Sequence, residues 1–184
     1  DLSNTAWVAE ALHATKFLAT EVYQEDAEAE EAQQKTWRRV TAFLESCQSL
    51  SETAGDGGFS YRPNAGLVST GSMTYAGLKT MVYAELERDD PRVQGALDFV
   101  KHHYTLAENP GAGKNGYYYY LHAMAKALDA YGTDRLKLAD GSVRHWRRDI
   151  IDKLAGLQRA DGSWKNEQGR YFESIPELVT AYSM

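Results

Sequence analysis

The sequence predicts an all-α protein built from repeated helical hairpins in two layers. Apolar residues recur at steps of three and four in several separate stretches, which is the spacing of one face of an α-helix. Alternating strand patterns are short or stand next to glycine. Helices of two compositions alternate along the chain, which is typical of a repeat architecture. We therefore expect a helix–loop–helix array across the 184 residues.

The first half of the chain shows one amphipathic helix between two helices of a different kind. Residues 37–47 carry an apolar stripe, whereas residues 4–7 and 73–78 are rich in Ala, Thr and aromatic residues. Small side chains let helices approach closely. We therefore expect the helices of the second kind to form an inner layer and the amphipathic ones to form an outer layer.

The second half continues the alternation. An outer-type helix is expected over 90–104, because Asp90 is a good N-cap and Pro91 suits the first helical position. An inner-type helix follows over 118–128 and ends at Gly132. Residues 146–157 form the next outer-type helix, and residues 179–182 resemble the other inner helices. The chain thus holds about three and a half hairpins.

Two of the outer helices end in a glutamine that precedes a glycine–aromatic turn. Gln48 leads to Gly57-Gly58-Phe59, and Gln158 leads to Asp161-Gly162-Ser163-Trp164. The two glutamines lie 158 − 48 = 110 residues apart, which is two periods of about 55 residues. A weaker copy, Asn115-Gly116-Tyr117, stands at the corresponding turn between them.

Composition excludes several classes of function. A net charge of −6, without a Lys/Arg cluster, argues against a nucleic-acid partner, because phosphate binding needs a basic face. No apolar run approaches the ~20 residues of a transmembrane helix. The single cysteine, Cys47, excludes an internal disulfide and a cysteine-based zinc site. The sequence indicates no metal and no cofactor, and it does not indicate a compartment.

Residues 1–184 read as one repeat domain. The chain begins at a helix cap and ends within the apolar pattern of 178–184, with no C-cap. We therefore expect this domain to be a fragment that is truncated at both ends.

The glutamine-containing turns resemble those of a known superfamily. The run from Gln158 to Trp164 looks like the QW motif of squalene-hopene and oxidosqualene cyclases. The run from Gln48 to Phe59 looks like a looser copy, similar also to the Gly-Gly-Phe turns of protein prenyltransferase β subunits. Together with 72–78 and 116–120, the whole chain resembles bacterial prenyltransferase and squalene oxidase repeat proteins.

That resemblance implies an α/α toroid, here a partial one. It also implies a structural role for the repeat motif, in which the glutamine and the aromatic residue tie neighbouring outer helices together. The residues expected to have this structural role are Gln48, Gly58, Phe59, Gln158, Gly162 and Trp164.

The chemistry of these families makes demands that the sequence does not meet. A squalene-type cyclase uses an Asp-x-Asp-Asp run as a strong acid, and no such run occurs here. A protein prenyltransferase holds zinc with Asp, Cys and His. Cys47 lies on an apolar stripe and has no Asp two residues before it. Neither activity follows from the resemblance, and the catalytic residues are not assigned.

The tyrosine-rich inner helices supply the candidate ligand-cavity residues. Four consecutive tyrosines cannot all face one direction, so Tyr118 or Tyr119 is expected to face the centre of the array. His122 follows Tyr118 by four residues on the same face, and Tyr75 belongs to the preceding inner helix. Packing between the two layers explains these aromatic residues equally well.

Two functions remain open at the level of sequence. The first is a terpenoid-cyclase- or prenyltransferase-like domain that binds or processes an apolar, isoprenoid-type small molecule in an aromatic cavity. The second is a non-catalytic binding or scaffold module, or a carbohydrate-active toroid, because one fold hosts many functions. An incomplete toroid would also expose apolar faces, so self-association through the open face is a further expectation.

Overall fold

The computed structural model of the chain describes residues 1–18, 26–50, 55–63 and 68–184. It is 60% helical, which confirms the predicted all-α class. The elements in chain order are α1 (Leu2–Ala14), α2 (Ala27–Cys47), α3 (Gly71–Tyr83), α4 (Pro91–His103), α5 (Tyr117–Tyr131), β1 (Leu136–Lys137), β2 (Val143–Arg144), α6 (Trp146–Leu157), η2 (Arg170–Phe172) and α7 (Pro176–Ser183). The two strands form a small antiparallel hairpin between α5 and α6.

Helix boundaries follow the signals in the sequence. The Asp90 carboxylate accepts a hydrogen bond from the Arg92 main-chain N–H, with Pro91 at the first helical position of α4. Gly132 ends α5 in the left-handed conformation, with a φ of 74°. The bounds of α6 are those expected from its apolar stripe. The expected cap and breaker residues therefore lie where the sequence predicted them.

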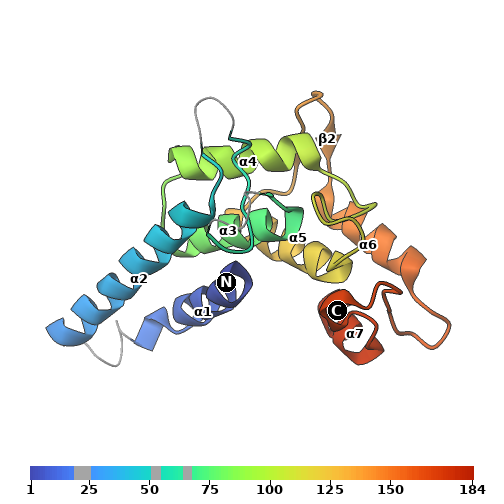
Figure 1. The fold of residues 1–184 in the computed structure, drawn as a ribbon, viewed down its shortest axis with the longest axis horizontal. Coiled ribbons are helices and arrows are strands. Elements are labelled where there is room, and N and C mark those ends of the chain that lie inside the picture. Colours follow the sequence, from blue (N-terminus) through green and yellow to red (C-terminus); the bar gives the residue numbers. More distant parts are fainter. Residues whose placement is uncertain (19–25, 51–54, 64–67) are drawn as a thin grey trace.

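The helices form two rows. The odd-numbered helices contact one another in chain order, as α1 with α3, α3 with α5, and α5 with α7, and we call them the inner row. The outer row consists of α2, α4 and α6, which pack on α1, α3 and α5 respectively. Figure 1 shows α2, α4 and α6 on the outside of a curved inner row.

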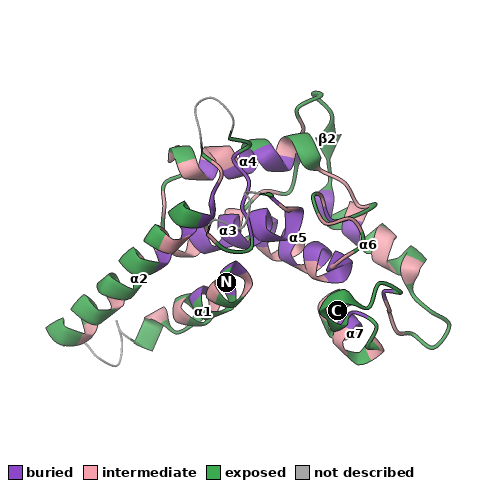
Figure 2. Cartoon of the chain, in the orientation of Figure 1, coloured by how far each residue is buried: buried purple, intermediate pink, exposed green. Residues whose placement is uncertain are grey.

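Burial is most extensive in α3 and α5, the two central helices of the inner row (Figure 2). Every residue of α3 from Gly71 to Met81 is buried, whereas the outer helix α6 buries only Trp146 and Ile150. Close packing of α3 depends on its small residues. A Cβ atom on Gly77 would lie only 2.9 Å from the ring of Phe59. The small residues of α3 thus reflect its packing on all sides.

The first glutamine turn joins two outer helices. Gln48 caps the C-terminus of α2, and its Nε2 atom donates to Gly57 O at 3.0 Å and to Arg92 O at 2.7 Å. Gly57 has a φ of 74°, and a Cβ atom there would overlap the backbone of Gly95 in α4. One buried amide therefore ties the end of α2 to the first turn of α4.

The second glutamine turn repeats the same hydrogen bonds. Gln158 Nε2 donates to Gly162 O at 2.9 Å, and Gly162 has a φ of 83°. Main-chain bonds from Gly162 to Arg159 and from Arg159 to Ser163 match those between Ser49 and the Gly57-Gly58 pair. Gly162 therefore corresponds to Gly57, and Ser163 corresponds to Gly58.

The aromatic residues of the two turns are held in the same way. The main-chain N–H of Phe59 donates to the Thr74 hydroxyl of α3 at 3.0 Å. That of Trp164 donates to the Thr180 hydroxyl of α7 at 3.2 Å. Phe59 is fully buried, whereas Trp164 is half-buried against the core around α5 and α6. Each aromatic residue thus anchors its turn to the following inner helix.

The middle repeat does not follow the expected pattern. Gly116 lies at the N-cap of α5, so Asn115-Gly116-Tyr117 is not a turn after an outer helix. Tyr104 ends α4 in the extended conformation that Gln48 and Gln158 adopt. Its hydroxyl donates to Asp149 in the first turn of α6 at 2.9 Å. A tyrosine therefore replaces the glutamine as the tie between outer helices.

Candidate functional site

A cavity of about 260 Å³ lies beside the N-terminal halves of α1, α3 and α5 and the C-terminal end of α7. Helices α1, α3, α5 and α7, the η2 segment and the intervening loops all contribute to its wall. The lining residues are Ser3, Asn4, Trp7, Tyr61, Thr70, Ser72, Met73, Asn109, Ala112, Gly116, Tyr119, Tyr171, Glu173 and Tyr182. Five of these are aromatic, and most of the others carry neutral polar groups. We call this space the inner cavity.

Around the inner cavity, α1, α3 and α5 each donate an N-terminal main-chain N–H to the loop that precedes the next inner helix. The Leu2 N–H of α1 donates to Tyr61 O at 2.9 Å. The Ser72 N–H of α3 donates to Asn109 Oδ1 at 2.9 Å, and the Tyr119 N–H of α5 donates to Glu173 Oε1 at 2.8 Å. The first N–H groups of a helix lack partners within the helix. This need fixes the loops at the cavity rim.

Asn109 is a buried cap with all of its amide atoms engaged. Its Oδ1 accepts from Ser72, and its Nδ2 donates to Ser72 Oγ at 3.0 Å and to Asn115 O at 3.2 Å. The side chain therefore joins the start of α3 to the loop before α5, and it gives the cavity a rigid polar wall.

Glu173 is the second such cap, and the sequence analysis did not identify it. The side chain is 0% exposed, and its Oε2 accepts from Asn166 Nδ2 at 2.6 Å. Negative charge at the N-terminus of α5 is favoured by the helix dipole. The residues before it, Tyr171 and Phe172, have φ values of 63°, which is unusual for aromatic side chains. The loop accepts this strain while it presents Tyr171 and Glu173 to the cavity.

Aromatic rings from three inner helices form a continuous row at the base of the inner cavity. The rings of Trp7 and His122 stack with their centroids 5.7 Å apart and an interplanar angle of 28°. His122 lies 5.7 Å from Tyr182, and Tyr182 lies 5.9 Å from Tyr119 in an edge-on contact. Such separations are typical of favourable aromatic pairs. Because Trp7, Tyr119 and Tyr182 also line the cavity, the row forms its aromatic base.

His122 is held as a neutral imidazole within this row. Burial lowers its pKa, and the nearby positive charges of Lys79 and Lys126 lower it further. A hydrogen bond to the main chain of Tyr182 opposes this shift. The Nε2 atom is buried and has no hydrogen-bond partner among the residues that the structure describes. The ring is therefore an apolar stacking partner with one free acceptor or donor atom.

Two lysines share one carboxylate beside the aromatic row. Lys79 Nζ lies 2.6 Å from Glu10 Oε2, and Lys126 Nζ lies 2.9 Å from Glu10 Oε1. Lys79 is 5% exposed and also lies over the Trp7 ring at 5.3 Å from its centroid. The two ammonium groups lower the pKa of the Glu10 carboxyl, although burial acts in the opposite direction and is the larger single effect. This cluster connects α1, α3 and α5 through charge.

The structure separates the four candidate residues that the sequence suggested. Tyr119 lines the inner cavity, and His122 lies directly behind Trp7 and Tyr182. Tyr118 is buried edge-on against Tyr117 and is not part of the lining. Tyr75 is also buried outside the lining, where burial raises the pKa of its hydroxyl well above the usual value. His122 therefore shares its surroundings with Tyr119, three residues earlier, rather than with Tyr118.

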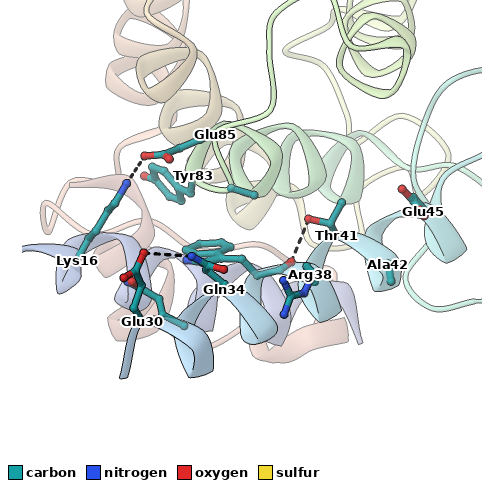
Figure 3. A pocket seen from close by; sticks show the side chains of 12 residues that line it. Lys16, Glu30, Gln34, Arg38, Thr41, Ala42, Glu45, Tyr83 and Glu85 are labelled. Carbon is teal, nitrogen blue, oxygen red and sulfur yellow. Dashed lines mark hydrogen bonds and ion pairs between the residues drawn. The ribbon is translucent and has the colours of Figure 1, made fainter. Parts of the chain in front are cut away.

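A larger cavity of about 670 Å³ lies elsewhere, between the C-terminal parts of α1 and α3 and the length of α2. Figure 3 shows that its walls carry mostly long polar side chains, such as Lys16 paired with Glu85, and Gln34 donating to Glu30. Most of these side chains are exposed. We prefer the inner cavity as the candidate site, because it alone combines aromatic rings with buried polar groups.

The described residues hold neither a group of metal ligands nor a membrane-spanning helix. In the described part of the chain, no three His, Cys, Asp or Glu side chains are grouped as metal ligands would be. None of the described helices is long and apolar enough to cross a lipid bilayer.

No protein-family model matches the chain, and no curated protein or solved structure matches it significantly.

Proposed function

We propose that this chain is a repeat domain of the squalene-cyclase and prenyltransferase type, forming part of an α/α toroid. We further propose that its inner cavity binds an apolar small molecule of the isoprenoid class. The observation that carries the proposal is the convergence of Trp7, Tyr119 and Tyr182, from three different inner helices, on one cavity. Aromatic rings offer large apolar surfaces whose π-faces complement the double bonds of such a ligand.

The repeat structure supports the toroid. Turns at Gln48 and Gln158 share their hydrogen bonds, and each is tied to the following inner helix through a threonine. A two-row array of similar repeats curves steadily, because each repeat adds the same small rotation. The curved inner row in Figure 1 agrees with this.

Binding rather than alkene protonation fits the groups at the cavity. The carboxylate of Glu173 accepts hydrogen bonds at both oxygens, from the Tyr119 N–H and from the Asn166 amide. This carboxyl group is fully buried and is engaged as a helix cap. No second carboxyl group appears among the lining residues that the structure describes.

A titration tests the proposal directly. Addition of farnesol to the protein is expected to quench tryptophan emission saturably, because Trp7 borders the cavity. Replacing Tyr182 with Leu removes one ring of the base and is expected to weaken binding about tenfold, from the loss of ~1–2 kcal/mol of aromatic contact. Trp37 lines the larger cavity, so Trp37→Phe serves as the control and should leave the affinity for farnesol unchanged. Quenching that does not saturate, or that survives Tyr182→Leu unchanged, contradicts the proposal.

A non-catalytic binding or scaffold module is the second candidate. Apolar side chains are exposed along the α6–α7 edge, with Ile151 64% and Phe172 73% exposed, and apolar area of this kind favours association. Neutral polar groups in the cavity wall, such as Asn4 and Ser72, would also suit a carbohydrate. Sedimentation at micromolar concentration and a parallel titration with oligosaccharides distinguish these alternatives from the isoprenoid ligand.

A further inference from the structure

The inner cavity carries an unbalanced negative charge. Among the lining residues in the described part of the chain, Glu173 is the only Asp, Glu, Lys or Arg. Its side chain is fully buried, and no lysine or arginine among the described residues forms an ion pair with it. A buried charge is normally paired with an opposite charge. A cationic ligand would supply that missing partner.

Existing contacts stabilise the carboxylate only in part. It accepts the Tyr119 N–H at 2.8 Å and the Asn166 amide at 2.6 Å, and the α5 N-terminus adds a partial positive charge. Each carboxylate oxygen has about two acceptor positions, and these bonds occupy one on each oxygen. Burial raises the pKa of the Tyr182 hydroxyl, and the negative charge of Glu173 raises it further. The field of Glu173 therefore reaches the cavity.

The aromatic residues of the lining point to the same kind of ligand. The five rings belong to Trp7, Tyr61, Tyr119, Tyr171 and Tyr182. The face of each ring carries the negative part of its quadrupole and attracts cations, and organic ammonium groups are recognised by such rings together with a carboxylate. Lys79 lies over Trp7 and shares the carboxylate of Glu10 with Lys126, and neither lysine forms an ion pair with Glu173.

We propose that the inner cavity binds an organic cation, namely a tertiary or quaternary ammonium group, between its aromatic rings and the carboxylate of Glu173. This rests on the proposed function in using the same cavity, and it adds a positive charge to the apolar ligand. Methylated ammonium groups fit better than a primary ammonium. A quaternary ammonium has no N–H donor and a tertiary one has a single donor, whereas a primary ammonium must replace three hydrogen bonds on entering the cavity.

The test compares two molecules that differ only in charge. Choline and its neutral carbon isostere, 3,3-dimethylbutan-1-ol, are titrated against the protein by calorimetry and by saturation-transfer NMR. Choline is expected to bind about tenfold more tightly or better, because the cation–π and carboxylate contacts require the charge. Equal affinities for the two molecules overturn the proposal, and so does the absence of choline binding at millimolar concentration.

Two pairs of variants locate the effect. Glu173→Gln removes the charge in the cavity and is expected to abolish the preference for choline. Glu177→Gln removes a charge from an exposed position on α7 and should leave that preference intact. If Glu173→Gln does not fold, as judged by circular dichroism, the second pair decides: Tyr182→Leu should lose the preference and Tyr182→Phe should keep it. Retention of the preference in Tyr182→Leu overturns the proposal.

The outcome is separable from that of the proposed function. Saturable farnesol binding with no preference for choline over its isostere overturns only the cation proposal. Choline binding without farnesol binding overturns only the isoprenoid proposal.

Discussion

His122 shows how one residue reports on the state of the inner row. Its ring is stacked between Trp7 and Tyr182, and burial together with the positive charges of Lys79 and Lys126 lowers its pKa below the usual value near 6.5. Protonation would place a third positive charge beside the two lysines. The neutral ring is therefore part of the folded state.

A pH titration checks this placement. Because the pKa of His122 is lower in the folded than in the unfolded state, the unfolded chain binds more protons between the two values. The free energy of unfolding is therefore expected to fall as the pH drops from above 6.5 towards the folded pKa. NMR of the imidazole should give a pKa below 6.5, and His122→Gln should remove this part of the pH dependence. A pKa at or above 6.5 contradicts the buried placement.

Individual residues differ in how far the sequence could predict them. Asp90 and Gly132 act through local backbone geometry, so their roles were predicted correctly. The sequence could not show which of the four consecutive tyrosines faces the inner cavity, because this depends on how α5 packs against its neighbours. Glu173 gave no local signal. Its function as a cap arises from a contact with Tyr119, 54 residues earlier in the chain.

At the scale of elements, the repeat is carried by hydrogen bonds rather than by sequence identity. Gln48 and Gln158 make the same bond to a glycine carbonyl, and Tyr104 takes the corresponding position in the middle repeat. The Asp140-Gly141 turn of the β hairpin has similar bonds without a glutamine. The aspartate–glycine turn alone is therefore a common local structure, and the preceding side chain is what joins the helices.

The two glutamines provide a matched pair for measuring this tie. Gln48 is buried and donates to both Gly57 O and Arg92 O, whereas Gln158 is exposed and donates only to Gly162 O. Gln48→Ala is expected to lower the free energy of unfolding by about 1–3 kcal/mol, because it removes both of these hydrogen bonds from a buried site. Gln158→Ala should cost less than about 0.5 kcal/mol. Urea denaturation measures both, and equal costs would show that Gln48 does not join α2 to α4.

At the scale of the whole molecule, the inner row has two tasks. Its small residues allow close packing of α3 against its neighbours, and the N-terminal halves of α1, α3 and α5, with the loops that cap them, line the inner cavity together with Tyr182 of α7. The sequence predicted the helical class, because composition and periodicity are properties of single helices. It could not predict the cavity, whose wall combines loops separated by a full repeat of the chain.

The central claim is that the inner cavity, and not the larger cavity beside α2, is the ligand site. The most direct test is ¹⁵N NMR of the protein during titration with farnesol. We expect the largest shift changes at the Trp7 indole and at the main-chain amides of Tyr119, Glu173 and Tyr182, with those of Trp37 and Thr41 unchanged. Shift changes confined to Trp37 and its neighbours on α2, or none at saturating ligand, would contradict the account.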